Sequence, residues 1–193
     1  MLVAGMVSVK DFPLAPLMLR NLSNFCQQLV IRFDAAEREY PDLWTKCMES
    51  IPNTTKVHVF HSYTRWNRWN WREELLRTMD DFEPDCVLTP DSDERFPWGF
   101  DETIEDFMNS KANYMLFKAS MVTQTPRSVP LYPGGPHCKM FKWEPDMTYT
   151  DYRGFARPWF GNHKPGNIYE PMGEILHYCF WTPEMEQNKV LHR

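Results

Sequence analysis

Three carboxylates stand within four residues in the segment C-V-L-T-P-D-S-D-E, residues 86–94. The apolar run 86–88 is typical of a buried strand, and Pro90 helps to end it. Asp91 and Asp93 are two residues apart, so in an extended segment their side chains point the same way. Two oxygen ligands on one side suit Mg²⁺ or Mn²⁺, with water and a diphosphate completing the shell. The alternative is a solvated acidic turn, because turns favour Asp.

The residues around this segment alternate between strand and helix patterns. Strand patterns cover 2–9, 28–34, 56–60, 86–89 and 113–120, and helical spacing covers 14–25, 41–51, 71–80 and 101–109. This alternation predicts an α/β fold with a mostly parallel central sheet flanked by helices.

The order of elements also predicts where the carboxylates lie. In open α/β sheets, ligands bind in a crevice outside the carboxyl ends of the strands. Asp34 ends the second strand pattern and Asp91 follows the fourth. Both are expected to face one crevice, which favours a binding site over a plain acidic turn.

The residue composition and the hydrophobic pattern change after residue 121. Prolines and glycines punctuate short aromatic pieces, and no long helical pattern occurs before 183–191. Such a loop-rich, aromatic half suits the walls of a binding site better than a second domain. We therefore expect one domain over 1–193.

Composition limits the functional class. The 193-residue chain has a net charge of −5, which disfavours a general nucleic-acid binder, although 62–77 is locally basic. Its five cysteines contain no C-x-x-C pair, which predicts reduced, mostly buried thiols and a cytoplasmic protein. No run approaches the roughly 20 apolar residues of a membrane span, so we expect no membrane insertion.

Three segments together resemble the GT-A glycosyltransferases, specifically the family-2-like group. They are V-A-G-M-V-S-V-K-D (3–11), I-R-F-D (31–34) and V-L-T-P-D-S-D-E (87–94). The resemblance covers 2–120 in element order and extends weakly to H-Y-x-x-W-T-P-E (177–184). It implies a single Rossmann-like domain, with 1–120 as the nucleotide-sugar-binding half and 121–193 as the acceptor-side half.

The resemblance implies a metal site. Carried over to this sequence, Asp93 is the main ligand of Mn²⁺ or Mg²⁺, and Asp91 contacts the ribose or the metal. Many GT-A enzymes add a late histidine, for which His177 is the first choice and His137 the second. The alternative for His177 is a neutral histidine that is hydrogen-bonded within the core.

The resemblance also implies a pocket for the nucleotide. Asp34 matches the acidic residue that contacts the base, and Lys10 and Asp11 lie in the loop after the first strand. The segment T-R-W-N-R-W-N-W-R (64–72) is either a stacking platform or a loop packed on the sheet. Arg72 is expected to reach the donor diphosphate.

A catalytic base is harder to assign. Inverting members of the family deprotonate the acceptor hydroxyl with an Asp or Glu, often from an E-D pair. This sequence has no such pair in its second half, and Asp146 and Asp151 are the candidates.

These residues indicate a metal-dependent glycosyltransferase that uses a nucleotide-sugar donor. The alternatives are a noncatalytic sugar- or nucleotide-binding module and a metal-dependent nucleotidyltransferase. The sequence leaves open whether the acceptor is a glycan, a protein, a small molecule or modified DNA. It also leaves open the donor sugar, the stereochemical outcome and the oligomeric state.

Overall fold

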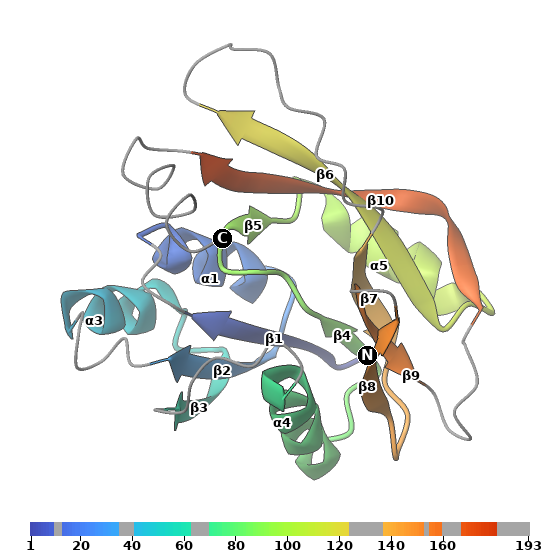
Figure 1. Cartoon of the computed structure of the whole chain (residues 1–193), viewed down its shortest axis with the longest axis horizontal. Coiled ribbons are helices and arrows are strands. Elements are labelled where there is room, and N and C mark those ends of the chain that lie inside the picture. Colours follow the sequence, from blue (N-terminus) through green and yellow to red (C-terminus); the bar gives the residue numbers. More distant parts are fainter. Residues whose placement is uncertain are drawn as a thin grey trace.

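The computed structural model describes residues 1–9, 13–34, 41–62, 70–123, 137–152, 155–159 and 167–180 (Figure 1). The strands are β1 (Val3–Val9), β2 (Gln28–Asp34), β3 (Lys56–Ser62), β4 (Cys86–Leu88), β5 (Glu94–Arg95), β6 (Tyr114–Thr123), β7 (His137–Lys142), β8 (Thr148–Tyr152), β9 (Phe155–Trp159) and β10 (Ile168–Phe180). The helices are α1 (Ala15–Ser23), α3 (Pro41–Ser50), α4 (Asn70–Thr78) and α5 (Phe100–Asn109), with a 3₁₀ turn η1 (Met79–Asp81) after α4.

Eight of these strands form one sheet in the order β3-β2-β1-β4-β7-β6-β10-β5. Strands β3, β2, β1 and β4 are parallel, and β6 is parallel to β10. Strand β7 is antiparallel to both β4 and β6, and β5 is antiparallel to β10. The expected mostly parallel, Rossmann-like sheet with flanking helices is therefore confirmed.

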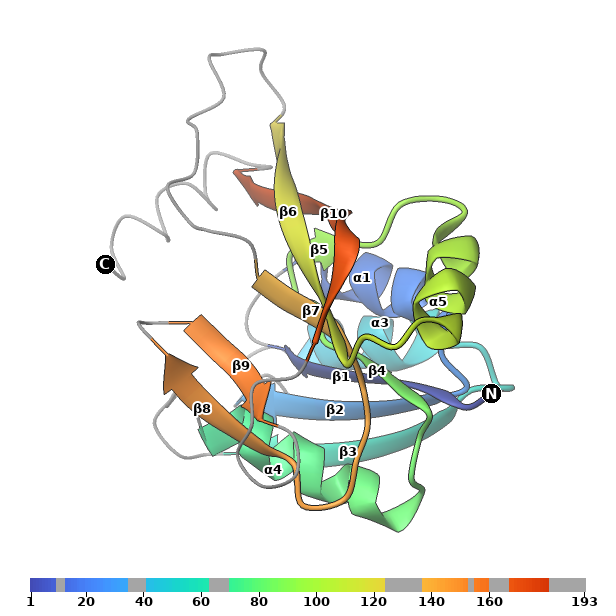
Figure 2. The ribbon, with the colours of Figure 1, turned by 90° about the vertical axis from the view of Figure 1, so that its right-hand side faces the viewer.

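Helices cover both faces of the sheet. In Figure 2, α1, α3 and α5 lie on one side and α4 lies on the other. Strand β1 is buried on both faces, because Val7 and Val9 pack in the cluster of α1 while Ala4 and Met6 pack in the cluster of α4. This two-sided burial explains why β1 reads as a continuous apolar run.

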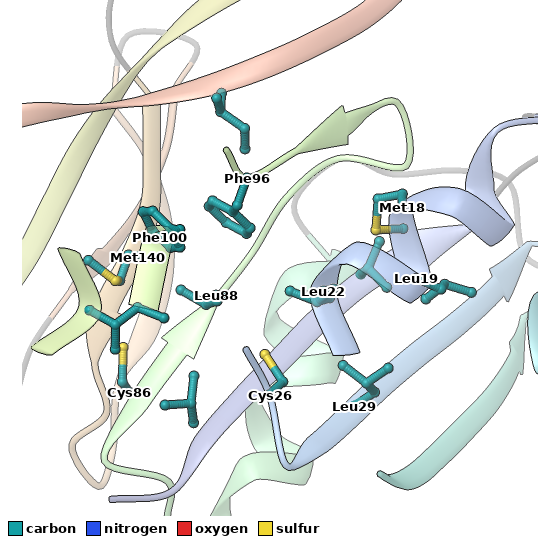
Figure 3. Close-up of a cluster of buried hydrophobic side chains, with 14 of the residues drawn as sticks. Met18, Leu19, Leu22, Cys26, Leu29, Cys86, Leu88, Phe96, Phe100 and Met140 are labelled. Carbon is teal, nitrogen blue, oxygen red and sulfur yellow. The ribbon is translucent and has the colours of Figure 1, made fainter. Parts of the chain in front are cut away.

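Helix α1 shows how a sequence pattern sets the packing. Its buried residues are Ala15, Met18, Leu19 and Leu22, which recur at the spacing of one helical face. Figure 3 shows Met18, Leu19 and Leu22 beside Leu29, with Leu88 and Phe96 farther along the same cluster. The helix thereby packs against the strands whose carboxyl ends lie beside the acidic turn.

The second half departs from the expected loop-rich texture. Its described residues form β7, β8, β9 and β10, and β8 pairs with β9 in a separate two-stranded sheet. Prolines interrupt the sequence pattern of two of these strands. Pro158 lies in β9, and Pro171 lies in a register irregularity of β10 between Tyr169 and Gly173. Proline is tolerated at edges and bulges because no ladder hydrogen bond is needed there. The helical pattern at 183–191 lies outside the described residues.

Four of the cysteines, Cys26, Cys47, Cys86 and Cys138, are free and buried, as the sequence predicts. Burial raises the pKa of the Cys47 thiol to about 12. No helix in the described part of the chain is long and apolar enough to cross a membrane.

Candidate active site

The acidic segment forms a turn at the carboxyl end of β4. The carbonyl of Asp91 accepts a hydrogen bond from the Glu94 amide at 3.0 Å, and the Asp91 amide donates to Oε2 of Glu94 at 2.7 Å. Glu94 is buried, with 3% of its surface exposed, whereas the side chain of Asp91 is 45% exposed. Glu94 thus supports the turn, and Asp91 lies at its surface.

Two cationic side chains hold the Asp91 carboxylate. Nζ of Lys139 lies 2.8 Å from Oδ2, and NH2 of Arg72 lies 3.2 Å from Oδ1. Arg72 comes from α4 and Lys139 from β7, so Asp91 joins elements on either side of β4. Both carboxylate oxygens of Asp91 are engaged in this arrangement.

Asp93 is bound to a different element, strand β10. Its Oδ2 lies 3.0 Å from Nε2 of His177, and its carbonyl accepts a hydrogen bond from the Tyr178 amide at 2.8 Å. The antiparallel register places His177 opposite Glu94. Side-chain exposure is only 12% for Asp93 and 14% for His177, so the pair is well shielded.

The site's charges shift its pKa values. Burial raises the pKa of Asp91, but the nearby Lys139 and Arg72 outweigh burial and hold it below the ordinary value. For Glu94, burial is the largest effect and raises the pKa despite Lys139. Burial lowers the pKa of Lys139, but Asp91 and Glu94 reverse this and raise it. Asp91 and Lys139 are therefore a charged pair at neutral pH.

Asp93 and His177 are hydrogen-bonded to each other, with Oδ2 and Nε2 3.0 Å apart. Carboxylate oxygen and imidazole nitrogen can both bind a divalent cation, and two neighbouring ligands of an octahedral ion, each about 2.1 Å from it, are also about 3.0 Å apart. Mg²⁺ commonly takes one or two protein carboxylates and completes its shell with water and substrate phosphates. Within the described residues, no group of three or more His, Cys, Asp or Glu side chains is placed to hold a metal. Asp91 is directed toward Lys139 and Arg72, and its role as a ligand stays a prediction.

Of the remaining candidates for the nucleotide pocket, the structure describes only the backbone of Asp34. Asp34 is the last residue of β2 and pairs with Ser62 of β3, at the same edge of the sheet as the acidic turn. The Asp34 side chain, Lys10 and Asp11, and the loop 63–69 lie outside the described parts. The sheet therefore supports the shared crevice at the level of the backbone.

The two candidate bases are placed differently. Strand β7 is antiparallel to β4 and ends with Lys142 opposite Cys86, at the amino end of β4. The exposed Asp146 follows in a turn with φ 61°, so the structure does not bring it to the acidic turn. Strand β8 runs back from that turn toward the side of the β1 carboxyl end (Figure 2) and carries Asp151, whose side chain is outside the described set.

Sequence reasoning missed Lys139. The signal was present, because Lys139 stands between Cys138 and Met140 in an otherwise apolar run. A lysine in a buried strand requires a partner, since an unpaired buried charge is costly. Only the pairing of β7 with β4 shows that its partners are Asp91 and Glu94.

The fold is that of a Rossmann-like, GT-A-like α/β domain, and its acidic turn lies at the carboxyl end of β4. No protein-family model and no curated protein matches the sequence.

Solved structures with a similar fold include S. aureus TarS and a mannosyltransferase. Staphylococcus aureus TarS matches at a TM-score of 0.47 and 17% identity, over 68% of this chain and 23% of that chain. The mannosyltransferase PcManGT from Pyrobaculum calidifontis, in complex with GDP-Man and Mn²⁺, matches at a TM-score of 0.43 and 17% identity, over 63% of this chain and 35% of that chain.

A third similar structure is 4-diphosphocytidyl-2C-methyl-D-erythritol synthase from Anaerococcus prevotii. It matches at a TM-score of 0.47 and 14% identity, over 73% of this chain and 70% of that chain. This chain thus spans about a quarter of TarS and about a third of PcManGT. At these identities and scores, the likeness identifies neither a substrate nor a reaction.

Proposed function

We propose that this chain is a metal-dependent glycosyltransferase domain that moves a sugar from a nucleotide-diphosphate-sugar donor to an acceptor hydroxyl. The observation that carries the proposal is the Asp93–His177 pair, held at the crevice edge of the sheet with its two side-chain atoms 3.0 Å apart. Beside the pair, Arg72 and Lys139 supply positive charge.

The chemistry of glycosyl transfer suits such a site. The leaving group is a nucleoside diphosphate, and its developing charge must be stabilised as the glycosidic bond breaks. A divalent cation on Asp93 and His177 would supply this stabilisation without proton transfer. Arg72, which is 12% exposed and paired with Asp91, would add a charge-assisted hydrogen bond to a diphosphate oxygen.

The other roles follow from position. Asp34 and the Lys10 loop would contact the nucleotide, because both follow strands that end at this crevice edge. Asp151 is the better candidate base, since Asp146 lies at the opposite edge of the sheet. A base there would take the proton of the acceptor hydroxyl as the sugar is transferred.

The test is a thermal-shift panel of nucleoside diphosphates and nucleotide sugars with and without Mn²⁺, followed by turnover of each stabilising donor. We expect Mn²⁺-dependent stabilisation and release of the nucleoside diphosphate when an acceptor is added. Binding without turnover of any donor would instead support a noncatalytic module. Consumption of a nucleoside triphosphate with release of pyrophosphate would support a nucleotidyltransferase.

A further inference from the structure

Lys139 is a buried lysine at the centre of the acidic turn. Its residue is 3% exposed, and Nζ lies 2.8 Å from Asp91 Oδ2 and 2.7 Å from Glu94 Oε2. The Lys139 carbonyl also accepts a hydrogen bond from the Thr89 amide at 2.9 Å, which fixes β7 beside the start of the turn. The ammonium is therefore held by the fold and is not a surface side chain that happens to reach the site.

The ammonium changes what the turn can bind. Without it, Asp91 would lose the cation on Oδ2 and keep Arg72 on Oδ1. A carboxylate oxygen freed in this way can serve as a ligand for a divalent cation that binds beside it. With Lys139 and Arg72 in place, both oxygens of Asp91 are already paired with cations.

We propose, on the basis of the function proposed above, that Lys139 is a built-in counter-cation that reserves Asp91 from the divalent metal. The metal then binds at Asp93 and His177, and Asp91 positions Arg72 toward the donor diphosphate. Lys139 is thus a positioning residue, because it acts through Asp91.

Energetics favour this division of roles. For a metal to take Asp91 Oδ2, the buried ammonium of Lys139 must give up one of its two carboxylate partners and lie beside a second cation. Like charges so close together repel each other strongly in a buried site. Asp93 presents no such obstacle, since its Oδ2 faces an imidazole that can itself bind a metal through nitrogen.

The experiment measures Mn²⁺ binding to the protein without any donor, by titration with detection of free Mn²⁺ by electron paramagnetic resonance. Lys139→Met removes the charge and keeps much of the volume. We expect it to bind Mn²⁺ about tenfold more tightly, or at an added site, because Asp91 becomes available. Lys139→Arg keeps the charge and is expected to bind Mn²⁺ as the wild type does.

Two further variants locate the effect. The double variant Lys139→Met/Asp91→Asn should return to wild-type affinity, because the gain depends on the Asp91 carboxylate. Asp91→Asn alone should change Mn²⁺ affinity less than about threefold, whereas Asp93→Asn should abolish binding. If Lys139→Met fails to fold, Lys139→Gln takes its place with the same expected result, because it also removes the charge beside Asp91.

Several results would overturn the inference. They are unchanged or weaker Mn²⁺ binding by folded Lys139→Met, an equal loss in Asp91→Asn and Asp93→Asn, and no Mn²⁺ binding by the wild type. The binding measurement is independent of turnover. If the expected Mn²⁺-binding pattern appears but no nucleotide sugar is turned over, the role of Lys139 is supported and glycosyl transfer is refuted. If donors are turned over but the Mn²⁺-binding pattern is not seen, glycosyl transfer is supported and the role of Lys139 is refuted.

Discussion

Nε2 of His177 lies 3.0 Å from Oδ2 of Asp93, although 84 residues separate the two in the chain. Strand β10 brings them together by pairing antiparallel with β5, so that His177 stands opposite Glu94. The backbone bond from the Tyr178 amide to the Asp93 carbonyl fixes the same contact. The last described strand and the acidic turn thereby form one unit.

This unit leads to the first prediction. Asp93→Asn should abolish Mn²⁺-dependent stabilisation by a nucleoside diphosphate and lower donor turnover by at least about 100-fold, because a neutral amide binds a hard cation poorly. Thermal shift and steady-state kinetics measure the two effects. Glu105→Gln, on the exposed side of α5, is the matched control and should behave as the wild type. Full metal dependence in Asp93→Asn would refute the assignment of Asp93.

The second prediction concerns Arg72. Arg72→Gln should raise the KM for the donor about tenfold, as expected for the loss of one charge-assisted hydrogen bond to a diphosphate. Arg77→Gln on the same helix is the control, because Arg77 is 64% exposed and pairs with Glu73 one turn away. Donor KM values that change equally in the two variants would argue against a specific contact by Arg72.

The third prediction concerns the packing of β10. A Cβ on Gly173 would lie 2.4 Å from Cε1 of Phe117, whose ring is 1% exposed and has little room to move. Gly173→Ala should therefore lower the free energy of unfolding by about 1–3 kcal/mol, as overpacking does. Urea unfolding measures the change. Met172→Ala, at a neighbour that is 42% exposed, should stay within about 0.5 kcal/mol of the wild type. Equal stability of Gly173→Ala and the wild type would show that β10 can shift freely.

The fourth prediction is a pH dependence. Burial, and next the charge of Lys139, lower the pKa of His137 from 6.5 to about 4. Between these values the unfolded chain binds more protons at this histidine than the folded protein does. The free energy of unfolding therefore falls as the pH drops from 6.5 toward 4.

Replacing His137 tests this sign. His137→Gln should make the decrease in the free energy of unfolding at acid pH smaller by about 1 kcal/mol, once solvent screening of a half-buried ring is allowed for. Urea unfolding at pH 7.0 and pH 5.0 compares the two proteins. If the free energy of unfolding decreases equally between these pH values in the wild type and in His137→Gln, the lowered pKa of His137 is refuted.

Local pattern was a good guide to the first two thirds of the chain. The strands at 28–34 and 86–88 and the helix at 101–109 match their expected ranges closely, because each buries a face whose period can be read in one segment. The pattern missed β9 and the first part of β10, where proline at a bulge or edge interrupts the alternation without ending the strand. The apolar pair Ile175–Leu176 before His177 does predict a short late strand, and this is the end of β10.

The candidate site divides in the same way. The sequence by itself determined that Asp91 and Asp93 follow a buried strand, and it predicts that they lie at the ligand-binding end of the sheet, because parallel strands share one such end. Only the tertiary structure decided that Asp93 meets His177 while Asp91 meets Lys139 and Arg72. Strand pairing between distant segments sets these contacts, and residue spacing along the chain carries no record of which strands become neighbours.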